Sequence, residues 1–283
     1  MAYNGKMWLL GGHGMTGGGD VWYSTDGVTW TRGGSMPGQR ARGGHTSVVY
    51  AGKMWIMGGG QSLPRNDVWY STNGTTWTQA TAHAAWSPRR SHASVVYDGK
   101  IWLIGGTDGN NALDDVWYSR NGTSWSLATA RGPWTAGVLN HAFVVFDGKM
   151  WVIAGNPYYN AAYSSNGLNW TVATNGWGPW LGKMGGMGVV ASAGKLWLMG
   201  GLQLPPAWDE YANDVWSSTD GVSWRLVSPQ GYAPWWPRQL FAPVVFDRRM
   251  WILGGATSSG ALFNDVWYSQ FPAETTPAWK LYR

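Results

Sequence analysis

The sequence predicts an all-β fold, a six-bladed β-propeller of four-stranded antiparallel blades, and three observations support this prediction. The tetrapeptide Gly5–Trp8 recurs along all 283 residues, with lysine-position spacings of 47, 47, 49, 46 and 54 residues and a degraded last copy, Arg248–Trp251. Most copies are followed by paired glycines, by Asp-Val-Trp-Tyr-Ser and by Asp/Asn-Gly-x-x-Trp. Each period also contains four short runs that are typical of β-strands.

The second copy shows how one period divides into strands. Its four runs, named a to d, are 45–50, 53–57, 67–71 and 75–78. Ala51-Gly52 forms a two-residue turn between a and b, and Asn73-Gly74 predicts a type I′ hairpin between c and d. Glycine-rich turns interrupt every run before ten residues of helical periodicity accumulate, so a helical interpretation fails.

The first copy is shorter than the others at its start. Only Met1-Ala2-Tyr3 aligns with the last part of strand a, so the first blade is expected to lack most of its inner strand. Two explanations stay open: the chain is a fragment of a longer protein, or the closure between the first and last blades is absent. A missing native N-terminus would favour a secreted or periplasmic location, because it would hide a signal peptide.

The repeat resembles the kelch repeat, found in kelch proteins and in the central domain of galactose oxidase. The resemblance rests on Arg-x-x-His before strand a, at Arg42/His45 and Arg89/His92, and on two further sets of residues. These sets are the double glycines at 11–12, 58–59, 105–106, 200–201 and 254–255, and the strand-d residues Trp30, Trp77, Trp125, Trp170, Trp224 and Trp279. The resemblance implies the propeller fold over one domain, 1–283, with blades at approximately 1–32, 42–79, 89–127, 138–172, 184–226 and 238–283. It does not specify function, because kelch propellers include enzymes, sugar-acid mutarotases and peptide-binding adaptors.

Composition excludes several classes of site. The chain has no cysteine, which rules out disulfides, thiolate chemistry and the Tyr–Cys copper site of galactose oxidase. The five histidines show neither HxH nor HExxH spacing, so no metal or other cofactor is expected. No apolar run is long enough to span a bilayer. A net charge of +5 without a recognition motif argues against a nucleic-acid partner.

The connections between strands differ in length on the two faces of the propeller. The a–b and c–d turns are tight and share one face. The b–c and d–a connections are long and variable, share the other face, and are expected to carry function. Of the 24 tryptophans, seven fall outside the repeat, all on these variable loops: Trp86, Trp134, Trp177, Trp180, Trp208, Trp235 and Trp236.

Four of these seven, Trp86, Trp134, Trp180 and Trp235, recur before the histidine position and are expected to pack their own loops against the blades. The other three are singular and suggest ligand contact. Residues that depart from the repeat gather on blades 4 to 6. The predicted ligand-binding residues there are Tyr158, Tyr159, Trp177, Lys183, Trp208, Tyr211, Trp236 and Arg238.

The aromatic residues of this set would stack on a ligand, and Lys183 and Arg238 would hold a carboxylate. Arg42, Arg89 and Arg238 also have a structural interpretation, since the arginine of kelch-like blades often pairs with an acidic or carbonyl group of the neighbouring blade. The sequence leaves both interpretations of Arg238 open. The aspartate of Asp-Val-Trp is expected to be a strand-start or turn residue.

The sequence therefore predicts a propeller that recognises a carbohydrate or a small anionic molecule through its variable loops. One alternative is a kelch-type enzyme acting on a sugar acid, in the manner of a mutarotase or epimerase, with His13, Asp209 and Glu210 as the available acid–base groups. Another is a protein-binding scaffold for acidic peptides. Whether the protein is an enzyme stays open at this point.

Overall fold

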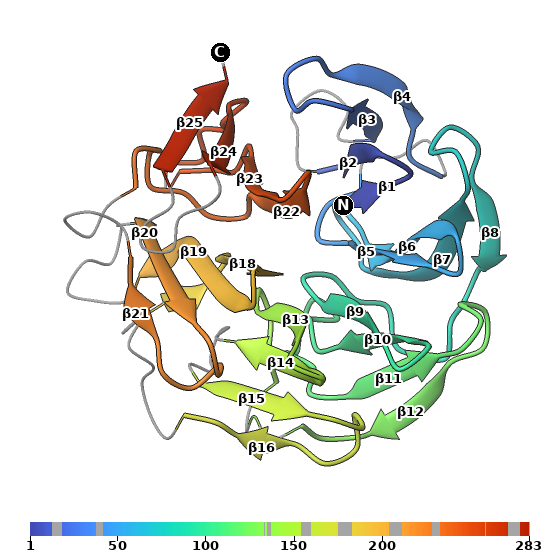
Figure 1. Ribbon diagram of the computed structural model, residues 1–283. Helices are drawn as coiled ribbons and strands as arrows, with labels where there is room; N and C mark the ends of the chain where they lie inside the picture. Colours follow the sequence, from blue (N-terminus) through green and yellow to red (C-terminus); the bar gives the residue numbers. More distant parts are fainter. Residues whose placement is uncertain are drawn as a thin grey trace. The chain divides into compact units, whose positions relative to one another are not determined.

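The computed structural model describes residues 1–12, 19–37, 42–132, 134, 137–153, 160–174, 183–203, 211–227, 233–257, 259–270 and 278–282. Its strands form six antiparallel sheets, and in five of them the strands follow one another in chain order (Figure 1). In the sixth sheet β17 and β18 both pair with β19. The fold is the predicted all-β six-bladed propeller, and no residue of the described ranges lies in an α-helix. These ranges consequently contain no helix long and apolar enough to cross a membrane.

The chain divides into two compact units of three blades each, Met1–Leu139 and Asn140–Arg283. Blade 1 consists of β1 (Ala2–Tyr3), β2 (Lys6–Leu10), β3 (Asp20–Ser24) and β4 (Thr31–Ser35). Blade 2 consists of β5 (Thr46–Tyr50), β6 (Lys53–Gly59), β7 (Arg65–Ser71) and β8 (Thr78–Thr81). Blade 3 consists of β9 (Ala93–Tyr97), β10 (Lys100–Ile104), β11 (Val116–Ser119) and β12 (Ser126–Thr129).

The second unit repeats this plan with one addition. Blade 4 consists of β13 (Ala142–Phe146), β14 (Lys149–Ile153), β15 (Ala161–Ser164) and β16 (Thr171–Val172). Blade 5 consists of β17 (Lys183–Gly185), β18 (Gly188–Ser192), β19 (Lys195–Gln203), β20 (Tyr211–Ser218) and β21 (Arg225–Leu226). Blade 6 consists of β22 (Ala242–Phe246), β23 (Arg249–Leu253), β24 (Val266–Gln270) and β25 (Ala278–Tyr282). The addition is β17, which pairs with the far end of the long strand β19.

The first strand of blade 1 is short, as predicted. Strand β1 has two residues, where the other five blades have five-residue strands at the same position. First strands of adjacent blades lie beside each other within each unit: β5 contacts β9, and β18 contacts both β13 and β22. The side chains Thr46 and Ser94 meet across the first of these contacts, with their hydroxyl oxygens 2.6 Å apart.

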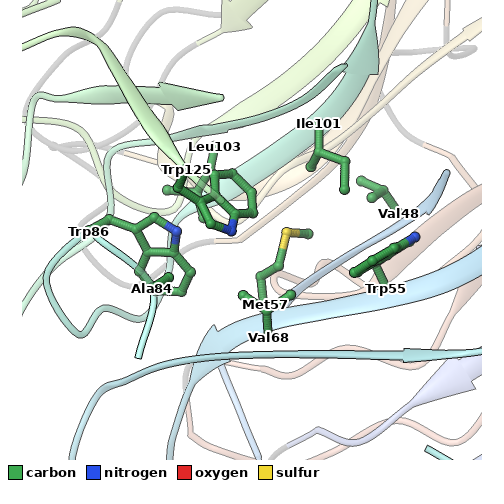
Figure 2. Close-up of a cluster of buried hydrophobic side chains, with 9 residues drawn as sticks. All are labelled: Val48, Trp55, Met57, Val68, Ala84, Trp86, Ile101, Leu103 and Trp125. Carbon is green, nitrogen blue, oxygen red and sulfur yellow. The ribbon is translucent and has the colours of Figure 1, made fainter. Parts of the chain in front are cut away.

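The core of the first unit lies between blades, because each sheet buries both of its faces. Met57 and Val68 of blade 2 pack with Ile101 and Leu103 of blade 3 (Figure 2). Trp86, from the loop that joins these blades, closes the cluster and meets the ring of Trp125 edge-on, with centroids 5.9 Å apart. A propeller blade covered on both faces needs this double burial, which explains the near-continuous apolar character of the second strands.

Three of the four recurring loop tryptophans are buried, as predicted. The side chains of Trp86, Trp134 and Trp235 are about 1% exposed. Trp180, the fourth member of this group, lies outside the described residues.

The prediction of a type I′ hairpin at Asn73-Gly74 is wrong, because only Gly74 has a positive φ. The hydroxyl of Ser71 accepts the N–H of Gly74 at 2.8 Å, and the side-chain Oδ1 of Asn73 accepts the N–H groups of Thr75 and Thr76, each at 3.0 Å. Asparagine thus builds a wider turn through its side chain rather than through its backbone. As a result, the fourth strand, β8, starts at Thr78 rather than at residue 75.

The type I′ geometry belongs to the a–b turns instead. Both central residues have positive φ in Ala51-Gly52 (48° and 69°) and in Asp98-Gly99 (47° and 65°). This turn matches the twist of the two strands that it joins and so fixes their register.

Each tryptophan of the second strands is fixed through its indole N–H, and the rings of Trp8, Trp55 and Trp151 also lie against a glycine of the next blade. The indole N–H of Trp55 donates to the carbonyl of Tyr50 at 3.0 Å, and the five equivalent tryptophans make the same bond to the end of their own first strand. The far side of the Trp55 ring lies against Gly122 of the next blade, where an added Cβ would come within 2.1 Å of the ring. Satisfied N–H groups and glycine contacts explain why the repeat retains tryptophan and glycine at these places.

Candidate functional site

The face that carries the long b–c and d–a connections is called the loop face below. The arginine of the Arg-x-x-His motif connects this face to the strands. Arg89 is fully buried and makes a two-pronged ion pair with Asp115, with N–O distances of 2.6 and 2.8 Å, and also donates to the carbonyl of Gly105 at 3.0 Å. Arg42 makes the equivalent contacts with Asp67 and Gly58. An acidic or carbonyl partner was expected from the neighbouring blade, but these partners belong to the arginine's own blade.

The aspartate of Asp-Val-Trp is therefore the partner of this arginine as well as a strand-start residue. The side chain of Asp115 also accepts the indole N–H of Trp117 at 2.7 Å. Burial alone would raise the pKa of Asp115, but the hydrogen bonds and charge of Arg89 outweigh it and lower this pKa. The sequence held a signal of this pairing, since blade 4 carries Val138 and Asn160 at the two positions and so lacks both charges.

Arg238 has the same structural role in blade 6. Its side chain is 0% exposed, and its Nη2 lies 2.7 Å from Asp265. Nη1 donates to the carbonyl of Gly254 at 2.8 Å, and Nε donates to the carbonyl of Trp236 at 3.1 Å. The geometry thus supports the structural interpretation of Arg238 and gives no support to its predicted contact with a ligand carboxylate.

Most of the other predicted site residues cannot be placed. The ligand-binding candidates Tyr158, Tyr159, Trp177 and Trp208, and the acid–base candidates His13, Asp209 and Glu210, lie outside the described residues. Lys183 begins β17, but its side chain is also outside the described part of the structure. Their predicted roles stay predictions.

Trp236 and Tyr211 are placed, and both lie on the loop face of the second unit. The side chain of Trp236 is 74% exposed, and among the tryptophans that the structure describes no other is exposed. Tyr211 begins β20, and its hydroxyl oxygen accepts a hydrogen bond from Nε2 of Gln239 at 2.8 Å. Gln239, which follows Arg238 directly, was missed by sequence reasoning because a single glutamine carries no pattern.

Backbone and side-chain hydrogen bonds hold the segment that carries Trp236 and Gln239. At its start, Asn213 Nδ2 donates to the carbonyls of Ala233 and Trp235, both at 2.8 Å. At its end, Gln239 exchanges two backbone hydrogen bonds with Ala256, at 3.1 and 2.9 Å. The exposed indole is therefore presented by a rigid segment, with Trp235 buried beside it as an anchor.

The residue after Gln239 belongs to a series that links adjacent blades. The N–H of Leu240 donates to the carbonyl of Gly186 at 2.9 Å, and that of Gly186 donates to Asn140 at 3.0 Å. In the first unit Ser91 donates to Gly44 in the same way at 2.8 Å. All five residues have φ between 54° and 69°, a conformation that costs Leu240 strain but not glycine.

The first unit presents a different surface on its loop face. Leu63 is 78% exposed at the tip of the β6–β7 loop. Arg90 lies nearby and donates to the carbonyl of Gln61 at 3.3 Å. Arg90 occupies the repeat position that Gln239 has in blade 6, so the same place is cationic in one unit and uncharged in the other.

Among the described residues, no three histidine, aspartate or glutamate side chains lie close enough together to share a metal ion. The candidate site consists of the exposed ring of Trp236 and of the neutral hydrogen-bonding groups of Gln239 and Tyr211.

Comparison with known proteins supports this architecture. The solved structure of YjhT is similar, with a TM-score of 0.80 and 18% sequence identity, over 98% of this chain and 95% of that one. No curated protein matches the chain. Residues 1–155, more than half of the chain, match the family model described as the KLHDC2/KLHL20/DRC7 kelch-repeats domain, and the chain therefore belongs to this kelch-repeat family.

Proposed function

We propose that this propeller recognises a carbohydrate on the loop face of its second unit, with Trp236 as the platform on which a sugar ring stacks. The observation that carries the proposal is the exposure of Trp236, 74%, among described tryptophans that are otherwise buried or half-buried. An exposed indole on a rigid segment is available to stack on a ligand, and the C–H face of a sugar fits an aromatic ring.

The rigidity of the segment adds to the argument. A side chain whose backbone is already ordered loses little further conformational entropy when a ligand binds, so more of the contact energy appears as affinity. An anionic ligand was predicted to bind to Lys183 and Arg238. Arg238 is already paired with Asp265, so one of these two cations is not available to a ligand. A carbohydrate held by stacking and neutral hydrogen bonds fits the described residues better.

The test is a glycan screen followed by calorimetric titration of the best ligand. We expect Trp236→Ala to weaken binding at least about tenfold, the effect of losing about 1.4 kcal/mol of contact energy. Leu168→Ala is the matched control, since Leu168 is also exposed but lies on a c–d turn. Sugar binding that survives Trp236→Ala, or the absence of any glycan ligand, would overturn the proposal.

A second candidate is the binding of an acidic, partly apolar peptide by the first unit. Exposed Leu63 and the guanidinium of Arg90 favour it, because Leu63 offers an apolar contact and no carboxylate among the described residues pairs with Arg90. Arg90→Gln should then abolish salt-sensitive binding of acidic peptides and leave glycan binding unchanged. An equal loss with Trp236→Ala would contradict two separate surfaces.

The enzymatic alternative, a sugar-acid mutarotase or epimerase, depends on His13, Asp209 and Glu210, which lie outside the described residues. Exchange NMR of sugar-acid anomers with and without the protein tests it directly. Interconversion no faster than in buffer would exclude that activity for the sugars tested.

A further inference from the structure

We infer that Gln239, held in place by Tyr211, reads the hydroxyl groups of the bound sugar and restricts the site to uncharged carbohydrates. The inference rests on the proposed function and specifies its ligand class. It starts from a contact that joins two blades: Gln239 Nε2, before the first strand of blade 6, donates to the Tyr211 hydroxyl oxygen of blade 5 at 2.8 Å.

This contact fixes which way the amide of Gln239 faces. With one Nε2–H group donated to Tyr211, the amide still has a second N–H donor and the acceptor Oε1. A donor and an acceptor side by side suit sugar hydroxyls, each of which can both give and receive a hydrogen bond. Gln239 is half-buried, so its amide is restrained without being sealed from solvent.

The neighbouring blade leaves room for this acceptor. Gly186 lies so close that a Cβ added there would stand 3.0 Å from Oε1 and 2.9 Å from Cβ of Gln239. Any larger residue at position 186 would crowd the amide. Gly186 also has a φ of 69°, which glycine adopts without strain.

The charge of the site follows from its neighbours. Arg238 is buried and paired with Asp265, so neither group offers its charge to a ligand. A carboxylate on the sugar would need a counter-ion to offset the loss of its hydration, and the described residues beside Gln239 supply none. A neutral sugar has no such requirement, and the site should therefore prefer it.

The two contact groups fit one oligosaccharide. Trp236 and Gln239 are three residues apart, a separation of at most about 11 Å along an extended chain. Stacking on Trp236 would supply most of the affinity, and Gln239 would supply selectivity, since an unmatched amide is costly to desolvate.

The experiment compares neutral oligosaccharides with oligomers of the corresponding uronic acids by isothermal titration calorimetry. The wild-type protein should bind the neutral series at least about tenfold more tightly. Gln239→Leu should weaken neutral binding, and Tyr211→Phe should weaken it less, because Tyr211 only positions the amide. Gln239→Arg, which copies Arg90 of blade 3, should shift the preference toward the uronic acids.

The two proposals can fail separately. If no sugar binds and Trp236→Ala changes nothing, the proposed function is wrong. If sugars bind and Trp236→Ala abolishes binding, but uronic acids bind equally well or Gln239→Leu stays within about twofold of wild type, the inference about Gln239 alone is wrong. Circular dichroism and melting curves of each variant show whether a loss reflects the site or the fold.

Discussion

The first three blades and the last three share one repeat, but they join neighbouring blades by different contacts. In the first unit, the hydroxyl of Tyr50 donates to the carbonyls of Gly99 and Arg120 in the next blade, at 2.8 and 2.6 Å. Tyr3 makes the equivalent bonds to blade 2. The second unit carries Phe146, Ser192 and Phe246 at this position, and none of these side chains reproduces the tyrosine hydroxyl.

The arginine–aspartate pairs differ in the same direction. Blades 2 and 3 of the first unit have the pair. In the second unit blade 6 keeps it as Arg238–Asp265, whereas blade 4 has lost both positions and blade 5 has Met184 at the arginine position. The family model matches residues 1–155, which includes all of the first unit. The first unit, which follows the repeat more closely, thus shows what the scaffold requires. The second unit, which departs from the repeat more often, carries the exposed Trp236 and the Tyr211–Gln239 contact.

The largest expected effect comes from breaking a regular pair. Arg89→Met should lower the free energy of unfolding by about 3–5 kcal/mol, because it leaves the carboxylate of Asp115 partly buried without its cation. Adding Asp115→Asn should restore part of this loss. Urea denaturation of the single and double variants measures the coupling, and additive losses would show that the pair is not the reason for the cost.

The second effect concerns glycines that contact tryptophan rings. Gly122→Ala should destabilise the protein by about 2–4 kcal/mol, since its Cβ would lie 2.1 Å from Trp55 and its φ is 77°. Gly99→Ala is the matched control: its φ is 65° but no atom lies within 4 Å of the added Cβ, so only about 1 kcal/mol is expected. Equal losses in thermal unfolding would exclude the ring contact as the cause.

The third effect is a pH dependence of stability that arises from His141 in the second unit. His141 is buried, and desolvation lowers its pKa from 6.5 to about 3. As the pH falls, the imidazole of His141 takes up a proton in the unfolded chain before it does so in the folded protein. The free energy of unfolding should therefore decrease as pH decreases from about 6.5 toward 3, by about 1.4 kcal/mol per pH unit. His141→Phe, which copies Phe241 at the same repeat position, should remove this component. Parallel pH profiles of the two proteins would contradict it.

The smallest effect exchanges the contact that distinguishes the two units. Tyr50→Phe should cost about 1 kcal/mol through the loss of its hydrogen bonds to blade 3. The reciprocal Phe146→Tyr should stabilise the protein by up to about 1 kcal/mol if blade 5 offers the same carbonyls. Chemical denaturation of both variants decides this, and a gain from Tyr50→Phe would show that the hydroxyl does not stabilise the first unit.

Turn chemistry shows how far local sequence reaches. The Asn-Gly signal located a turn at the right place but indicated the wrong geometry. The side chain of Asn73 accepts the backbone N–H groups of the next residues, and Asn73 itself lacks the positive φ of a type I′ turn. Ala51-Gly52, a weaker signal, forms the type I′ turn. Hydrogen bonds to the asparagine side chain, which backbone preference alone does not describe, thus set the geometry of the c–d turn.

The sequence by itself determined the blade number, the strand order within blades and the burial of the recurring tryptophans, because these follow from a repeated local pattern of strands and turns. Only the tertiary structure decided that Arg238 is enclosed by Asp265, 27 residues away, and that Gln239 meets Tyr211 across 28 residues. Such contacts depend on how strands register and how loops approach one another, and no local pattern encodes a distance between them.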